Sequence, residues 1–404
     1  LSLMHNGVTF YFLDNEFYFG GNQLYGYIHE DVEKFCFFSK AVLSILPDIG
    51  FRPDVIFAND WQTAAIPLLL KSQFYDYEFY SGIKSVMTIH NLRFQGIWDP
   101  LTVTDVLGLD KSYFSPDKLE YKGAVNLLKG GIAYADVVST VSPTYAEEIK
   151  TPEYGEGLEG LLGARSAELV GILNGISYEE YRPSIDPLIY SRYNRRDFIG
   201  GKRLNKYELQ KELGLTLDPS IMMIGIVSRL TDQKGFDLIG SIMEELMHMH
   251  CQLVVLGTGE EHYEKMFVSY AERYPEKVSA TMRFDNILAH KIYAASDVFL
   301  MPSAFEPCGL RQMISMRYGT LPIGRETGGL KDSIIPYNQY TGEGTGFTFG
   351  SYNAQDLLTI TKYARTIFDN KTTWNKLIRQ AMATDFSWNS SAKSYMELCH
   401  RILE

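Results

Sequence analysis

Short apolar runs of strand type alternate with longer segments of helical period along the whole chain. The helical segments include residues 32–46 and 123–135. Such alternation is typical of βαβ units, so the sequence predicts α/β architecture with parallel sheets. Strands are expected at residues 8–13, 53–58, 84–89, 136–141, 169–173, 221–227, 252–257, 278–284, 297–303, 320–324 and 346–349.

A stretch without clean strand period separates the two sets of strands. It follows residue 176 and is dense in tyrosine, proline and charge, which is typical of a domain boundary. We therefore predict an N-terminal domain over 1–176, a second over 177–385 and a last helix over 386–404. Within the stretch, Asn205 is expected to cap a helix that Gly214 ends.

Polar side chains follow five of the predicted strands at their carboxyl ends, where ligands bind in open α/β sheets. Each has a plain alternative, such as a helix cap, a turn residue, a core histidine or a surface ion pair. For His90 and Asn174 taken singly the plain alternative is favoured, but the five together favour a site in a cleft. These residues are Asp60, His90, Asn174, Arg229 and Glu306.

Two loops are candidates for binding phosphate. Residues 225–235 carry the cations Arg229 and Lys234, which suit a departing diphosphate, with a solvated loop as the alternative. Residues 324–332 contain Gly328 and Gly329 before a helix whose first N–H groups would face an anion. Taken alone, the second loop is better explained as a turn.

Glu306 lies in FEPCGLRQ, directly after a predicted buried strand. Pro307 suits the first position of a helix, so the carboxylate is expected at that helix's amino end. It would accept hydrogen bonds from sugar hydroxyls and stabilise positive charge at a sugar carbon. The alternative is a structural acid, and Cys308 on the same turn either contacts ligand or packs.

Charge and cysteine content exclude several classes of protein. Asp and Glu outnumber Lys and Arg by 49 to 38, so neither nucleic acid nor an anionic membrane is an expected partner. The four cysteines have no paired spacing, and no apolar run reaches membrane-spanning length, which leads us to expect a cytoplasmic protein. No P-loop or Asp-x-Asp pair occurs, so neither a bound metal nor another cofactor is expected.

Eight ordered motifs resemble the glycogen and starch synthases of bacteria and plastids. They are ANDWQT, TIHNLRFQG, YGEGLEGLL, GILNGIS, SRLTDQKGFDLI, EPCGLRQ, RETGGL and TGFTF, between residues 58 and 349. The resemblance implies a GT-B glycosyltransferase fold, two Rossmann-like domains around a deep cleft, with the last helix crossing back to the first. It also implies retaining transfer of glucose from ADP-glucose to the 4-hydroxyl of an α-1,4-glucan, without a metal.

The same resemblance assigns roles to individual residues. Arg229 and Lys234 would hold the diphosphate, Glu306 and His90 would contact the donor sugar, and Asp60 and Asn174 would line the cleft. The remaining expected substrate contacts are Trp61, Cys308, Gly309, Leu310, Thr327, Gly328 and Gly329.

The chain departs from the family pattern in one respect that bears on activity. The family's first K-T-G-G-L loop has no counterpart, since TGGL occurs here at 327–330. We therefore expect that roughly 30 residues or more, one βαβ unit, are missing, and that this chain by itself has little or no turnover. The alternatives are another GT-B sugar-nucleotide transferase and a non-catalytic glucan-binding protein.

Overall fold

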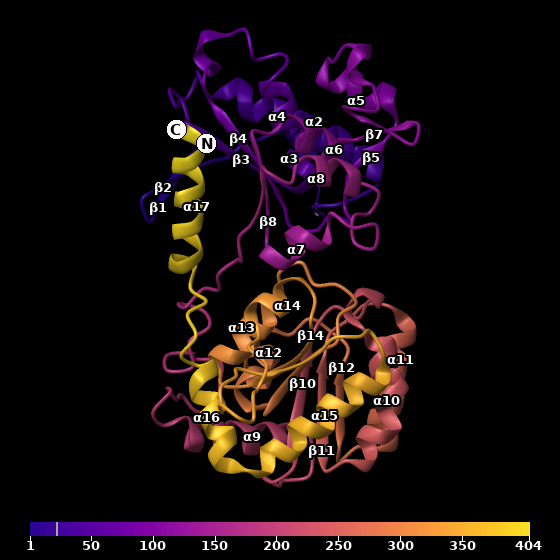
Figure 1. Cartoon of the computed structure of the whole chain (residues 1–404), viewed down its shortest axis with the longest axis vertical. Coiled ribbons are helices and arrows are strands. Elements are labelled where there is room, and N and C mark those ends of the chain that lie inside the picture. Colours follow the sequence, from indigo (N-terminus) through magenta and orange to yellow (C-terminus); the bar gives the residue numbers. More distant parts are fainter. Residues whose placement is uncertain (22) are drawn as a thin grey trace. The chain divides into compact units, whose positions relative to one another are not determined.

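The computed structural model describes residues 1–21 and 23–404, which form two compact units (Figure 1). The first unit comprises Leu1–Val141, Ala146–Ile172 and Tyr395–Glu404. The second unit comprises Ser142–Tyr145 and Leu173–Ser394. The main change of unit therefore falls at Leu173, and the last ten residues return to the first unit.

The second unit is built on a six-stranded parallel sheet. Its order is β12-β11-β10-β13-β14-β15, so the first strand in the chain, β10, lies in the middle. Most residues of these strands are buried, and all six strands predicted for this half of the sequence are confirmed. Their bounds are β10 Met222–Val227, β11 Cys251–Leu256, β12 Val278–Thr281, β13 Val298–Met301, β14 Leu321–Arg325 and β15 Phe347–Phe349.

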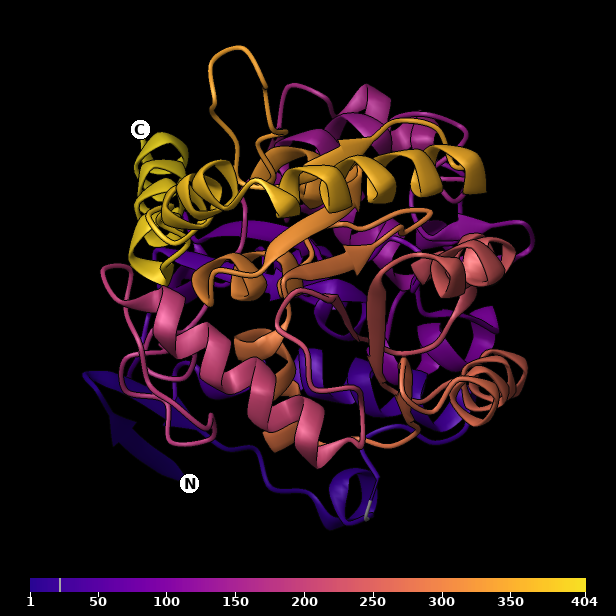
Figure 2. The same cartoon turned by 90° about the horizontal axis from the view of Figure 1, so that it is seen from below.

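Helices cover both faces of this sheet. Figure 2 shows strands of the sheet between α9 on one side and α15 on the other. Phe236, Phe267 and Phe299 are buried in this core. The helices are α9 Phe198–Glu212, α10 Phe236–His248, α11 Glu261–Arg273, α12 Asn286–Ala295, α13 Arg311–Arg317, α14 Gly328–Ser333, α15 Ala354–Asp369 and α16 Lys371–Ala381, with the 3₁₀ turn η3 Asp232–Lys234.

One predicted helix start in the second unit is wrong. Asn205 does not cap a helix, because α9 begins at Phe198 and carries Asn205 in its middle, fully buried. The Asn205 side chain accepts from the amide of Tyr190 at 3.0 Å and donates to Ser191 O at 2.7 Å. It therefore satisfies the backbone of the preceding loop, a task that the local sequence does not reveal.

The first unit has a four-stranded parallel sheet in the order β3-β4-β8-β9. The chain's last helix, α17, lies beside this sheet in Figure 1 and packs Leu398 against Val86, Val137 and Ile172. The C-terminal residues thus complete a core made from the first half of the sequence. The strands are β3 Val55–Asn59, β4 Lys84–Ile89, β8 Val137–Thr140 and β9 Leu169–Gly171, and α17 is Trp388–Leu403.

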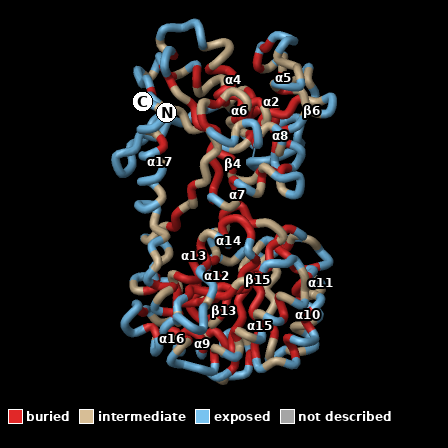
Figure 3. Tube along the Cα trace, viewed as in Figure 1, coloured by how far each residue is buried: buried red, intermediate tan, exposed pale blue. Residues whose placement is uncertain are grey.

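Two smaller sheets of the first unit differ from prediction. The strand predicted at 8–13 forms β2 Val8–Tyr11, but it pairs antiparallel with β1 Ser2–His5 in an exposed hairpin (Figure 3). A short antiparallel sheet, β5-β7-β6, was not predicted. Its strands are β5 Ile97–Trp98, β6 Glu120–Tyr121 and β7 Ala124–Asn126. Strand β7 occupies the first residues of the segment predicted as a helix at 123–135, so the helix there starts later than predicted.

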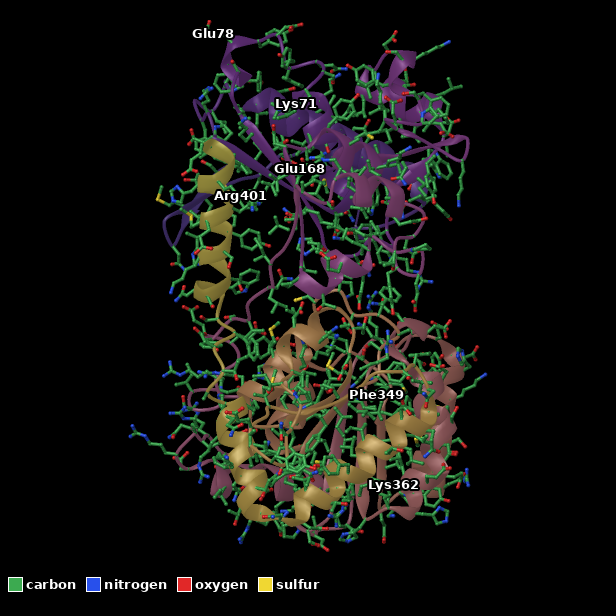
Figure 4. The ribbon with its side chains drawn as sticks, viewed as in Figure 1. Lys71, Glu78, Glu168, Phe349, Lys362 and Arg401 are labelled. Carbon is green, nitrogen blue, oxygen red and sulfur yellow. The ribbon has the colours of Figure 1, made fainter. Side chains whose placement is uncertain are left out.

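The helices of the first unit pack around the parallel sheet and its connections. At the end of α4, Lys71, labelled in Figure 4, pairs with Asp136 at 2.8 Å just before β8. Within the described residues, no helix is long and apolar enough to cross a membrane. The helices are α1 Glu16–Phe19, α2 Ile28–Ile45, α3 Asp60–Thr63, α4 Ala65–Leu70, α5 Pro100–Leu107, α6 Leu127–Tyr134 and α8 Glu159–Ala164, with η1 Glu78–Tyr80 and η2 Lys111–Tyr113; α7 Pro143–Glu148 has residues in each unit.

Candidate active site

The sheet of the second unit reverses its winding between β10 and β13, which are neighbours in space but not in sequence. In doubly wound sheets, ligands bind at such a reversal, outside the carboxyl ends of the strands. Arg229 and Lys234 follow β10, and Glu306 follows β13. The topology therefore brings these three predicted residues to one place.

Lys234 and Glu306 form a buried ion pair at this place. The Lys234 ammonium lies 2.8 and 2.6 Å from the two carboxylate oxygens of Glu306. Ser303 also donates its hydroxyl to Glu306 Oε2 at 3.0 Å, and Glu306 is only 6% exposed. A buried carboxylate that accepts three hydrogen bonds from two side chains is fixed in position, which is what a group that stabilises developing positive charge requires.

Gly235 explains how Lys234 reaches this position. Lys234 ends η3, and Gly235 follows with a φ of 74°, which joins η3 directly to α10. A side chain at 235 would collide with the carbonyl oxygen of Pro302, at the end of β13. Only glycine allows both the left-handed conformation and this close approach, which brings Lys234 beside the Glu306 loop.

The loop before Glu306 is held from two sides by residues that sequence reasoning missed. Gln233 donates its amide to Phe305 O at 3.2 Å, and its own carbonyl accepts from Ala304 N at 2.9 Å. Arg325, at the end of β14, donates to Ser303 O at 2.9 Å and also to Ala304 O. Arginine before the TGGL motif was the available signal, but its role depends on strand adjacency that the sequence does not display.

Arg229 and Arg311 supply further positive charge around the ion pair. Arg229 is exposed and has no hydrogen bond or ion pair among the described residues, so its guanidinium is available to an anion. Arg311, which was not predicted, lines a cavity of about 10 Å³ with Ser228, Lys234 and Glu306. That volume holds roughly one water molecule. In this conformation the cavity beside the ion pair is therefore too small for a diphosphate.

The expected helix at 308–319 begins later than predicted. Helix α13 starts at Arg311, and Gly309 before it has a φ of 68°. Glu306 therefore does not lie at a helix amino end, and the predicted stabilisation of its charge by the helix is wrong. The tight turn at Gly309 sets the loop apart from the helix, while Leu310 remains exposed and stays a candidate contact.

Cys308 and Asn174 lie against each other in the second unit. The amide of Asn174 is hydrogen bonded to the Cys308 sulfur, and burial raises the pKa of this thiol to about 12. Cys308 is thus a neutral packing group rather than a nucleophile. The side-chain oxygen of Asn174 is buried without a hydrogen bond partner in the part of the chain described, which leaves it able to accept from a ligand.

The TGG segment, residues 327–329, packs against the Glu306 loop. Thr327 precedes α14, and the amide of Gly329 donates to Glu306 O at 3.0 Å and to Pro307 O at 3.2 Å. A side chain at Gly328 or Gly329 would collide with the Glu306 or the Cys308 carbonyl. Gly329 therefore does not offer its N–H to an anion as predicted. These glycines allow two loops to pack closely, because no Cβ stands between them.

In the first unit, Asp60 and His90 are brought together at the carboxyl ends of β3 and β4. Asp60 Oδ1 accepts from the His90 amide at 2.7 Å, and His90 Nε2 lies 2.9 Å from Asn59 Oδ1. Asp60 has a φ of 54°, a costly conformation for a residue other than glycine. Burial raises the pKa of the Asp60 carboxyl, although the His90 amide opposes this shift. Asp60 thus shapes the loop that carries His90, and it is not the helix cap that was the plain alternative.

Trp61, expected to contact substrate, is only 6% exposed. Its ring meets Phe35 edge to face with centroids 5.2 Å apart, and a side chain at Gly96 would collide with it. Trp61 therefore packs against Gly96 and supports the 91–96 loop. Its role as a sugar contact stays a prediction.

One group in the second unit has the composition of a cation site. Asp232, Glu260 and His262 place ligand atoms within 4.8 Å of one another. Asp232 already accepts from the Tyr263 hydroxyl at 2.7 Å, and its amide donates to Glu260 at 3.1 Å. The group is held by its own hydrogen bonds, and the expectation of metal-free donor binding stays a prediction.

Family models match both parts of the chain. Residues 1–164 match the starch synthase catalytic domain, and residues 209–381 match the glycosyl transferases group 1 family. The chain is 61% identical to a glycogen synthase of Lachnospira eligens over 97% of its length and 82% of the relative's. It is 55% identical to one from Lachnoclostridium phytofermentans, over 98% of this chain and 84% of the relative.

Solved structures agree with the sequence relatives. The catalytic domain of starch synthase IV from Arabidopsis thaliana, bound to ADP and acarbose, matches with a TM-score of 0.87 and 36% identity, over 96% of this chain and 80% of that one. A sucrose-phosphate synthase from Thermosynechococcus elongatus, at 18% identity and a TM-score of 0.61, over 95% and 81%, shares the fold. The chain therefore belongs to the glycogen synthase family of glycosyltransferases, and the GT-B fold predicted from its sequence is confirmed.

Proposed function

We propose that the protein transfers glucose from ADP-glucose to the 4-hydroxyl at the non-reducing end of an α-1,4-glucan, with retention of configuration. The observation that carries this proposal is the Lys234–Glu306 pair at the strand reversal of the second unit, with ion-pair distances of 2.6 and 2.8 Å. Relatives named glycogen synthase support the glucan acceptor, and the ADP bound by the Arabidopsis enzyme supports the adenine nucleotide.

The charges of the second unit suit a leaving diphosphate. Arg229 has no hydrogen bond or ion pair within residues 1–21 and 23–404, and Lys234 would exchange its bonds to Glu306 for bonds to phosphate oxygens. Negative charge on the leaving oxygen grows as the bond to the sugar carbon breaks, so both cations bind the transition state more strongly than the ground state. The carboxylate of Glu306, released from Lys234, would then face the positive charge that develops on the sugar.

The transfer requires one proton movement. The bond between the anomeric carbon and the phosphate oxygen breaks, and a bond to the acceptor oxygen forms on the same face. The acceptor hydroxyl gives its proton to the leaving phosphate, so that ADP and a glucan longer by one residue are the products. In the first unit, His90 stays a predicted sugar contact, and Asp60 fixes the His90 amide.

The proposal also bears on whether the protein requires a cofactor and on where in the cell it acts. Neither a metal nor another cofactor is required, because cations of the chain itself neutralise the diphosphate. We infer a cytoplasmic location, which is supported by four cysteines that are all free thiols.

Calorimetric titration with ADP, with UDP as the comparison nucleotide, tests the nucleotide site. We expect saturable ADP binding that Lys234→Ala weakens about 10- to 100-fold, whereas Lys265→Ala, which removes an exposed lysine, leaves it unchanged. Incorporation of labelled glucose from ADP-glucose into glycogen then tests transfer itself. Binding of UDP in preference to ADP, or no nucleotide binding by the folded chain, would overturn the proposal.

A further inference from the structure

Three aromatic side chains form an exposed row on the first unit. The rings of Tyr27 and His29 lie 5.9 Å apart at 17°, and those of His29 and Trp98 lie 5.9 Å apart at 31°. Tyr27 is 73% exposed, the His29 side chain is 53% exposed, and Trp98 is half-buried. These three residues are called the aromatic row. Large exposed aromatic groups that are near neighbours commonly mark a binding surface.

The aromatic row lies at the same edge of the first unit as Asp60 and His90. Helix α2 leads into β3, and the amide of Gln62, just beyond the carboxyl end of β3, donates to the Tyr25 hydroxyl at 3.1 Å. The start of α2 is therefore at the carboxyl edge of the sheet. Trp98 belongs to β5, which follows the loop that begins with His90 at the end of β4.

Rigid elements carry the aromatic row. Tyr27 precedes the first turn of the 18-residue helix α2, whose inner face is buried. Trp98 pairs with Val125 in the sheet β5-β7-β6. The adjoining loop is fixed by the Asn126 side chain, which donates to Gln95 at 2.5 Å. Rings on such supports keep their spacing without a ligand, which lowers the entropic cost of binding.

The chemistry of the aromatic row suits a neutral sugar chain. Aromatic faces pack against the C–H faces of pyranose rings, and tyrosine and tryptophan add a polar atom at the ring edge. Carboxylates adjoin two members of the aromatic row in the sequence, Glu30 beside His29 and Asp99 beside Trp98, and both are exposed. They can accept hydrogen bonds from sugar hydroxyls, while their charge disfavours an anionic polymer.

We propose that Tyr27, His29 and Trp98 bind the acceptor glucan beyond its reacting end, as a platform for several successive glucose residues. The proposal rests on the proposed function and deepens it, because it assigns a binding site for the acceptor chain to residues outside the catalytic set. Long glucans engage this platform, whereas a disaccharide held at its reacting end is too short to use it fully.

Native gel electrophoresis with glycogen in the gel tests this site without requiring turnover. For Tyr27→Ala/Trp98→Ala we expect the apparent affinity for glycogen to fall about 5- to 10-fold. The matched control is Tyr75→Ala/Tyr77→Ala, which removes two tyrosines of the first unit that are 68% and 63% exposed, and it should retain the affinity of the parent chain. Tyr27→Ala alone, at a largely exposed position, should show part of the loss and guards against misfolding of the double variant.

The outcomes separate this proposal from the function on which it rests. ADP titration of the same variants should be unchanged, since the nucleotide residues belong to the second unit. Failure of the parent chain to bind ADP would overturn the proposed function, whereas ADP binding with unaltered glycogen retardation would overturn the platform. An equal loss in the control pair would overturn it too. So would a smaller oligomer in the Tyr27 variants than in the parent chain, because the aromatic row would then be a contact between two copies.

Discussion

The two units place their acidic candidate residues at equivalent edges of parallel sheets, yet use them differently. In the second unit Glu306 faces side-chain donors, Lys234 and Ser303. In the first unit Asp60 faces the backbone amide of His90. A carboxylate bonded to a side-chain ammonium can exchange that partner for a ligand, whereas one bonded to backbone fixes a loop. We therefore expect Glu306 to act in the chemistry and Asp60 to shape the loop that carries His90.

Glu306→Gln should have the largest effect. The amide keeps the size of the side chain but cannot stabilise positive charge on the sugar, so we expect whatever turnover the parent chain shows to fall about 100- to 1,000-fold. Glu326→Gln is the matched control, since Glu326 is an exposed acid just before Thr327. Equal turnover in the Glu306→Gln and Glu326→Gln variants would show that Glu306 has no role in the chemistry.

Lys234→Ala tests the buried pair through stability. The variant leaves the Glu306 carboxylate buried without its cation, which we expect to lower the free energy of unfolding by about 3 kcal/mol. Adding Glu306→Gln should restore part of that loss, because the uncompensated charge is then gone. Urea unfolding of the single and double variants measures both. Additive losses would mean that the two side chains are not coupled in the folded protein.

Asp60→Ala should destabilise the first unit by about 2 kcal/mol. It removes the acceptor of the His90 amide and leaves a non-glycine residue at a φ of 54°. Asp60→Asn keeps an acceptor and tolerates this conformation, so its loss should be less than half as large. Hydrogen exchange at the His90 amide reports the effect directly. Full protection in Asp60→Ala would show that the loop does not depend on this carboxylate.

The raised pKa of Asp60 gives the stability of the parent chain a dependence on pH that the Asp60→Asn variant lacks. Burial makes the folded state hold the proton more tightly than the unfolded state, so this group stabilises the fold below its ordinary pKa. That contribution is lost as the pH rises through the raised pKa. Relative to Asp60→Asn, the parent chain should therefore lose stability as the pH rises above about 4, the ordinary pKa of an aspartate. A constant difference in urea unfolding above this pH would contradict the direction of the shift.

The smallest effect is expected at Cys308. Burial raises the pKa of the Cys308 thiol to about 12 and that of Cys251 to about 11, whereas Cys399 is only partly buried. Iodoacetamide at pH 8 should therefore label Cys399 first and reach Cys308 only on unfolding. Cys308→Ala should change the affinity for ADP less than about 3-fold. Rapid labelling of Cys308 that ADP prevents would make it a ligand contact.

Most strands of the second unit could be predicted because they are largely apolar, buried runs between recognisable helices. The first unit was harder. The short strands β5 and β7 are two and three residues long, and β7 merges into the pattern of α6. A pairing between such segments depends on contacts across the fold, which local periodicity does not report.

The candidate site divides in the same way. Lys234 and Glu306 could be identified because each follows a predicted strand, and parallel topology brings the carboxyl ends of strands together. It could not identify Ser303, Gln233 or Arg325, whose roles consist of bonds to a neighbouring loop. The helix that follows Glu306 was predicted to start too early in the sequence. Pro307 is a helix-start signal, but the sequence equally allows the left-handed turn at Gly309 that delays the helix.

The return of α17 to the first unit has a consequence for biosynthesis. Leu398 packs in the core with Val86, Val137 and Ile172, so that core is incomplete until Leu398 has been made. On the ribosome, the core of the first sheet is therefore completed only after the second unit has had all of its strands available. Premature termination before Leu398 would leave the first sheet uncovered along this face, as a target for chaperones or proteases.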